Sequence, residues 1–385
     1  MPVRFTEELL SSTKGTPPLG CRYCDRGAKM VLYITGICRQ DCFYCPLSEK
    51  KKGKDVIFAN EREVSGDDWL DQVVDEASRM RALGTGITGG DPMVVPERTS
   101  DAIRRLKGEF GKRHHIHLYT TGPFDPSHLR EVRDAGLDEI RFHPPIDVWS
   151  FVGDRKEGSA AAAYLGLIME AKRVGLTTGL EVPAVVDPRG EGSVYSRGLT
   201  DLVGFAVDEG LRFVNINELE ASHTNIEAFK LRGYQLVPDS MAVKGSRELA
   251  LSVMDRVGRA RRDSRTSLHL CTSVYKDSIQ LRHRLLRMAR NLCKEYEVVT
   301  DDGTLLRGVV ETGNPEVLLE ELMDHFNVPG DLFEPGEGKL FTAPWVLQEI
   351  GRQLDEVCYI SEVYPTWDGL EVERIPVSGG ASSGP

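Results

Sequence analysis

Short runs of β-forming residues alternate with amphipathic segments from about residue 29 to residue 220. Apolar positions spaced three and four apart predict a helix from about residue 67, with Leu70, Val73, Val74, Ala77 and Met80 on one face. Further helices are expected at 100–110, 126–135, 160–174 and 199–209. The β runs lie at 30–35, 86–89, 116–120, 139–143, 177–186 and 213–217. Strands that alternate with helices predict an α/β fold with parallel pairing. Both an open sheet and a partial barrel fit the pattern, and in either the chemistry belongs at the carboxyl ends of the strands.

The pattern changes after about residue 225. Residues 299–305 predict a hairpin, because Asp302-Gly303 suits a tight turn. Helices are expected at 315–326 and 343–354, and strands at 357–364 and 370–377. The predicted organisation is an N-terminal segment 1–28, a core barrel 29–225, a barrel extension with a basic helix 226–295, an α+β region 296–377 and a disordered tail 378–385.

Composition and charge narrow the class of protein. The 385 residues are 40% hydrophobic and 28% charged, as in an ordinary soluble protein. Residues 1–15 lack the apolar core of a signal peptide, and the longest uncharged apolar stretch, 158–169, is too short to span a bilayer. We therefore expect a cytoplasmic protein without membrane contact. The net charge of −11 argues against a protein that coats nucleic acid with its whole surface.

Five of the eight cysteines crowd into residues 21–45, which favours metal binding over a disulfide scaffold. Cys38, Cys42 and Cys45 directly follow the first predicted strand, spaced three and then two residues apart. Soft thiolate ligands at this spacing suit an iron–sulfur cluster or zinc. Three ligands on a four-iron cluster would leave one iron open, as a catalytic metal site requires.

A second motif, Gly89-Gly90-Asp91-Pro92, ends the second β run. The glycines Gly84, Gly86 and Gly89 also match a dinucleotide-binding fingerprint. That fingerprint follows a strand and opens a helix, whereas these glycines bracket the strand itself. The dinucleotide interpretation is therefore rejected.

Together, the cysteine triad and the Gly-Gly-Asp-Pro motif resemble the radical S-adenosylmethionine (SAM) superfamily, in which Glu is commoner than Asp at the position of Asp91. The resemblance covers about residues 29–220 and implies a partial (βα)6 TIM-like barrel with a smaller C-terminal α+β region. Over its whole length the chain looks similar to a poorly characterised branch described as related to pyruvate formate-lyase activating enzymes. Such activases are usually little more than the barrel, whereas this chain carries about 150 further residues.

The resemblance implies a [4Fe–4S] cluster on the triad, with SAM on the open iron. One electron, from a donor such as ferredoxin or flavodoxin, then cleaves SAM to a 5′-deoxyadenosyl radical that takes hydrogen from a substrate. Contacts to SAM are implied for Tyr44, Gly89, Gly90, Asp91 and Pro92. Later strand ends supply further candidates for SAM or substrate contact, namely Arg141, His143, Glu181 and Asn217. For these four, surface or core polar roles stay open.

A second group of cysteines precedes the first strand. Cys21 and Cys24 form a CxxC half-site, which His269 and Cys271 would complete as a zinc site or an auxiliary iron–sulfur cluster. Buried free thiols are the alternative. Because one strand separates Cys24 from Cys38, the two sites would lie about 20 Å apart unless the first loop folds back.

The segment 244–294 carries a net charge of +9. Leu281, Leu285, Met288 and Leu292 form one helical stripe there, and arginines lie opposite. Either a solvated face or a phosphate-bearing partner explains the charge.

The leading hypothesis is an enzyme that cleaves SAM reductively and abstracts hydrogen from an unidentified substrate. An activase that places a radical on a partner protein, or an enzyme that modifies RNA or a nucleotide, is the alternative. From another class comes a non-catalytic zinc- or nucleic-acid-binding protein.

Overall fold

The computed structural model describes residues 4–6, 11–149, 160–188 and 194–377, so the predicted tail 378–385 lies outside the described residues. The chain folds into two compact units. One comprises residues 1–78 and 82–280, and the other residues 79–81 and 281–385. Within the described residues, no helix is long and apolar enough to cross a membrane.

The first unit is built on an 11-stranded sheet in the order β1-β2-β11-β10-β9-β8-β7-β6-β3-β4-β5. Seven neighbouring strands, from β11 to β3, are parallel. They are β3 (Lys29–Tyr33), β6 (Gly84–Thr88), β7 (His115–Thr120), β8 (Glu139–Phe142), β9 (Thr177–Pro183), β10 (Phe213–Asn217) and β11 (Ser267–Cys271). The predicted fold class is thus confirmed, and β11 adds a parallel strand to the six expected from the sequence.

Antiparallel strands extend both edges of the parallel sheet. On one side β2 (Ser11–Lys14) pairs with β11, and β1 (Arg4–Thr6) pairs with β2. On the other side lie β4 (Ile57–Ala59) and β5 (Arg62–Val64). The two edges do not pair with each other among the described strands, which leaves a partial barrel.

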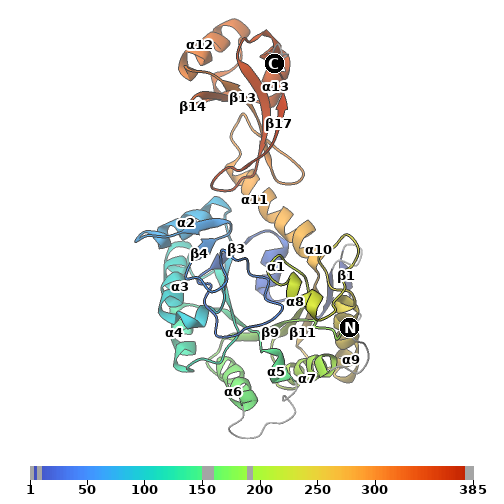
Figure 1. The fold of residues 1–385 in the computed structure, drawn as a ribbon. Helices are drawn as coiled ribbons and strands as arrows, with labels where there is room; N and C mark the ends of the chain where they lie inside the picture. The colour runs from blue at the N-terminus through green and yellow to red at the C-terminus, as the bar shows by residue number, and fades with distance from the viewer. Residues whose placement is uncertain (1–3, 7–10, 150–159, 189–193, 378–385) are drawn as a thin grey trace. The chain divides into compact units, whose positions relative to one another are not determined.

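Helices surround the outside of the strands (Figure 1). They are α2 (Trp69–Arg79), α3 (Pro96–Phe110), α4 (Ser127–Ala135), α5 (Ile146–Trp149), α6 (Ala160–Arg173), α7 (Val194–Asp208) and α9 (Ser246–Ala260). The short helix α8 (Ile226–Leu231) instead packs on the cysteine loop, where Phe229 contacts Phe43. Residues that point toward these helices are apolar and buried, as with Leu118 in β7 and Leu180 in β9. The alternate positions, such as Arg141 and Glu181, are polar and line the lumen. The period of two in a strand therefore gives this barrel an apolar outside and a polar inside.

Helix α1 (Leu19–Asp25) lies among the strands (Figure 1). A Cβ atom on Gly20 would come within 2.6 Å of both Arg141 in β8 and His117 in β7. A larger residue at this position would displace these two side chains, so glycine favours the close approach of α1 to the strands. The helix brings the CxxC pair into the lumen, so the first loop does fold back against the barrel.

The second unit contains a 6-stranded antiparallel sheet with the main order β14-β15-β13-β16-β17, and β12 beside β13. The strands are β12 (Val298–Val299), β13 (Leu305–Glu311), β14 (Phe333–Gly336), β15 (Lys339–Thr342), β16 (Val357–Val363) and β17 (Glu371–Pro376). Strands β12 and β13 form the predicted hairpin. Helices α12 (Pro315–Phe326) and α13 (Pro344–Ile350) bury Leu322 and Leu347 against the sheet residues Val310 and Cys358.

The basic helix of the sequence corresponds to α11 (Arg282–Leu292). Its stripe includes the buried Leu285 and Met288, as predicted. Several of its cations are engaged within this unit. Arg287 donates to the carbonyl oxygens of Met80 and Arg81, and Arg282 donates to that of Asp301. These contacts favour a structural role for part of the positive charge.

Candidate active site

One cavity of about 390 Å³ opens at the carboxyl ends of the barrel strands. It is lined by Cys38, Cys42 and Cys45, which are all half-buried, and these are its only cysteines among the described residues. The predicted contacts Tyr44, Gly89, Gly90, His143, Glu181 and Asn217 also line it. The structure therefore brings most of the residues singled out from the sequence to one place.

Close backbone contacts hold the cysteine loop against the end of β6. The amide of Gly90 donates to the carbonyl of Thr35 over 2.8 Å, and the amide of Asp91 donates to that of Ile37 over the same distance. A Cβ atom on Gly90 would lie 2.4 Å from the Ile37 oxygen, so only glycine permits this approach. The double glycine thus fixes the position of the three cysteines.

Asp91 and Pro92 are buried and do not line the cavity. The Asp91 carboxylate accepts hydrogen bonds from the side chains of Thr120 and Thr121 and from the amides of Thr121 and Met93, at 2.7–3.2 Å. These bonds tie the loop to the end of β7 and cap the 3₁₀ turn η1 (Pro92–Val94). Asp91 acts here through positioning of the glycines. Neither threonine was singled out from the sequence.

Tyr44 and His143 join the cysteine loop to β8 and β9. The Tyr44 hydroxyl lies 3.0 Å from Nε2 of His143, and Nδ1 of His143 lies 2.9 Å from the carbonyl oxygen of Glu181. A carbonyl only accepts, so Nδ1 carries the proton and Nε2 accepts from Tyr44. Burial lowers the pKa of His143, which agrees with a neutral ring.

Burial raises the pKa of the Cys38 and Cys42 thiols. Thiolates are the form that binds iron, so metal binding would release protons here. The donor set fits the implied cluster. Three soft sulfur ligands share one cavity, and on a four-iron cluster they would leave one iron without a protein ligand. Among the described residues, no group of three or more His, Cys, Asp or Glu side chains lies close enough together to hold a single metal ion as the side chains stand, so thiols that bind one would have to draw closer.

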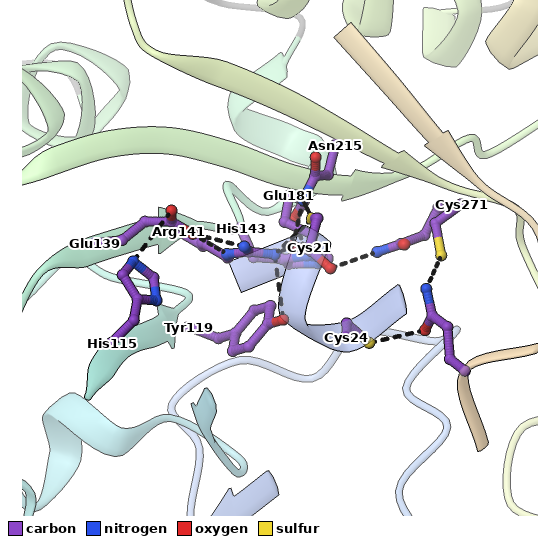
Figure 2. Close-up of polar contacts among 12 residues, drawn as sticks. Cys21, Cys24, His115, Tyr119, Glu139, Arg141, His143, Glu181, Asn215 and Cys271 are labelled. Carbon is purple, nitrogen blue, oxygen red and sulfur yellow. Dashed lines mark hydrogen bonds and ion pairs between the residues drawn. The ribbon is translucent and has the colours of Figure 1, made fainter. Parts of the chain in front are cut away.

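Below the cavity, a polar network centred on Arg141 fills the lumen (Figure 2). Arg141 pairs with Glu139 and, over 2.7 Å, with Glu181. Asn215 donates to Glu181 over 3.0 Å, and Asn217 donates to it over 3.2 Å. Burial works against ionisation of Glu181. The charge of Arg141 and the bond from Asn215 outweigh it and lower the pKa of Glu181 to about 2. Glu181 and Asn217 line the cavity. Arg141 lies beneath it and positions Glu181.

The second cysteine group lies beside this network (Figure 2). Cys21 Sγ is 3.1 Å from the Asn215 amide nitrogen and 3.4 Å from a guanidinium nitrogen of Arg141. Gln280 lies between the other two thiols, with Oε1 3.0 Å from Cys24 Sγ and Nε2 3.5 Å from Cys271 Sγ. His269 instead contacts Thr13 in β2 over 2.7 Å. The structure therefore brings Cys24 and Cys271 to Gln280, whereas Cys21 and His269 have other partners.

Sequence reasoning missed two residues at the cavity wall. Lys276 lines the cavity and contacts Glu220, which also lines it, over 3.0 Å. Lys276 begins a π-helix (Lys276–Leu281) that also carries Gln280. Such wide turns are frequent at functional sites but have no sequence signature.

Comparison with known proteins identifies the family of this chain. Residues 32–179 match the family model described as the radical SAM superfamily, and residues 303–377 match a domain of unknown function. A putative glycyl-radical enzyme activating enzyme of Methanocaldococcus jannaschii is 37% identical, over 98% of this chain and 97% of its own.

Two solved structures resemble the chain at low identity. Methylornithine synthase is 14% identical over 64% of this chain and 71% of its own, with a TM-score of 0.38. The FeFe-hydrogenase maturase HydG of Carboxydothermus hydrogenoformans is 15% identical over 51% of this chain and 46% of its own, with a TM-score of 0.37. The relative that matches over nearly the whole chain, and the superfamily match over the barrel, show that this chain belongs to the radical SAM superfamily and is a radical SAM enzyme.

Proposed function

We propose that this enzyme holds a [4Fe–4S] cluster on Cys38, Cys42 and Cys45, cleaves SAM reductively and abstracts a hydrogen atom from its substrate. The observation that carries the proposal is the single cavity shared by the three thiols and the double glycine. When bound, the cluster supplies the electron that breaks a carbon–sulfur bond of SAM. The chain's own residues position the reactants. Gly89 and Gly90 present backbone at the cavity wall, and Tyr44, oriented by His143, presents its ring there.

Anaerobic reconstitution with iron and sulfide, followed by dithionite and SAM, tests this proposal. We expect 5′-deoxyadenosine from the wild type, and none from the variant in which Cys38, Cys42 and Cys45 are all replaced by Ala. Cys293→Ala, a change in the other unit, should retain full activity. Full cleavage by the triple variant would contradict the assignment.

A protein substrate is the second candidate, because the relative from M. jannaschii carries the name of a glycyl-radical enzyme activating enzyme. In that case the hydrogen atom is taken from a backbone glycine of a partner. Incubation with pyruvate formate-lyase as a probe should then give a glycyl-radical doublet in the electron-spin spectrum, in proportion to the 5′-deoxyadenosine formed. 5′-Deoxyadenosine without any radical on the probe would count against this protein as substrate.

We also propose that Cys21, Cys24 and Cys271 bind a second metal, zinc or an auxiliary cluster. Support comes from the approach of the Gln280 amide to two of the thiols, at 3.0 and 3.5 Å. With His269 engaged by Thr13, Gln280 is the better placed fourth ligand. Thiolates bind soft metals. Because the surrounding lumen would enclose the metal, we expect it to have a structural role.

A further inference from the structure

Positive charge is concentrated beside the cysteine loop of a chain that is acidic overall. Residues 37–54 contain five Lys/Arg and two Asp/Glu, for a net charge of +3. The whole chain carries −11, so all other residues together carry −14. The residues beside the cavity cysteines are therefore opposite in charge to the chain as a whole, as is the basic segment 244–294.

The backbone holds these basic residues close to the cysteines. The amide of Gly36 donates to the carbonyl of Lys54 over 2.8 Å, and the amide of Gly53 donates to that of Gly36 over 2.9 Å. Lys52 and Gly53 line the same cavity as the three thiols. The turn that carries the lysines is thus part of the cavity rim.

The side chains on this rim are exposed. Arg39, Lys50, Lys52 and Lys54 all face solvent. Asp41 lies 3.7 Å from Lys52, and the other acidic residue of this segment, Glu49, is exposed beside Lys50, so the excess positive charge is spread over the rim. Ile37 is 37% exposed and adds an apolar contact in the middle of the basic residues. Weak redox encounters use small surfaces of this kind, below about 1,200 Å².

We propose that this surface, formed by Ile37, Arg39, Lys50 and Lys54, docks the one-electron carrier that reduces the enzyme, and that the carrier is a small acidic protein. The inference rests on the proposed function, which requires one electron per SAM cleaved. The electron leaves the reduced carrier and enters the cluster, and no bond is formed or broken in that step. Opposite charges speed such encounters and orient the partners.

Binding tests the surface without any catalysis. An acidic flavodoxin is titrated onto immobilised enzyme at an ionic strength near 10 mM, where the Debye length is about 30 Å. The variant Lys50→Glu/Lys54→Glu should weaken flavodoxin binding about tenfold or more. The control Lys112→Glu/Arg113→Glu makes the same charge change on exposed residues before β7, at the other end of the barrel strands, and should bind as the wild type does. Raising the salt to about 0.5 M should abolish the difference.

Activity with two reductants separates this proposal from the proposed function. Dithionite needs no docking surface, so the Lys50→Glu/Lys54→Glu variant should cleave SAM normally with dithionite and slowly with reduced flavodoxin. Wild-type enzyme that is inactive with dithionite would overturn the proposed function instead. Undiminished flavodoxin binding by the variant, equal losses in the control, or a loss with both reductants would overturn the docking surface.

Discussion

The Tyr44 hydroxyl donates a 3.0 Å hydrogen bond to Nε2 of His143, and this bond joins the cysteine loop to the end of β8. The two residues are 99 positions apart in the chain. Because Nδ1 of His143 donates to the Glu181 carbonyl, Nε2 has one role, that of acceptor. Tyr44 thus closes a chain of polar contacts from the cysteine loop to β9.

Replacement of Tyr44 by Phe should lower the free energy of unfolding of the metal-free protein by roughly 1–3 kcal/mol, because a buried acceptor on His143 loses its donor. A double-mutant cycle with His143→Phe measures the coupling energy between the two side chains. The free energy of unfolding of each variant is obtained by urea denaturation. We expect the double variant to be more stable than the sum of the two single losses predicts. Strict additivity would show that the two side chains do not interact.

The sequence predicts six of the parallel strands because apolar and polar residues alternate along them. It does not predict β11 (Ser267–Cys271), because this strand comes after residue 225, where the regular alternation of predicted strands and helices ends. Helix α1 was also missed, as seven residues with a glycine make no amphipathic pattern. Within the site, the sequence predicts the cysteine triad and the double glycine, because the residues of each motif lie close together in the chain.

The contacts that orient the site could not be predicted. Thr121 meets Asp91 through the register of β6 with β7, and Tyr44 meets His143 across a long separation. Gln280 reaches two thiols only because a π-helix carries it there. Each depends on tertiary placement that no local pattern encodes.

Gly90→Ala should disturb the cysteine loop. The added Cβ would lie 2.4 Å from the Ile37 carbonyl oxygen, so one of the two backbones must move. We expect a loss of roughly 1–3 kcal/mol in the free energy of unfolding, together with reduced iron incorporation on reconstitution. Gly108→Ala is the matched control, because a Cβ there meets nothing within 4 Å in α3. The control should stabilise the protein by up to about 1 kcal/mol. Equal stability of the two variants would contradict the close approach.

Stability should fall on acidification from pH 7.5 to pH 5.5. Burial lowers the pKa of His114, His115 and His269 to about 4. The unfolded values lie near 6.5, so between these limits the unfolded state binds more protons and the free energy of unfolding decreases as the pH falls. Each histidine contributes roughly 1.3 kcal/mol over this range, or about 4 kcal/mol for the three.

Urea denaturation at the two pH values measures this effect. His114→Gln should reduce the pH dependence by roughly 1.3 kcal/mol, and His223→Gln, a change at an exposed position, serves as the control. A wild-type protein of equal stability at both pH values would show that these histidines are not neutral when folded.

The final prediction concerns the metal content of the variant in which Cys38, Cys42 and Cys45 are replaced by Ala. If Cys21, Cys24 and Cys271 bind a second metal, this variant should still carry about one equivalent of zinc, or iron from an auxiliary cluster. Further replacement of Cys24 and Cys271 by Ala should remove it, because their thiols lie on either side of the Gln280 amide.

Gln280→Ala tests whether Gln280 is a metal ligand or only separates the Cys24 and Cys271 thiols. Loss of a ligand should weaken metal binding, measured by competition with a chelator, by about tenfold or more. His269→Ala should have little effect on metal binding, since His269 contacts Thr13. A triad variant free of all metal would refute the second site. In that case the three thiols remain free in the lumen, where burial raises the pKa of Cys271 to about 12 and keeps its thiol protonated.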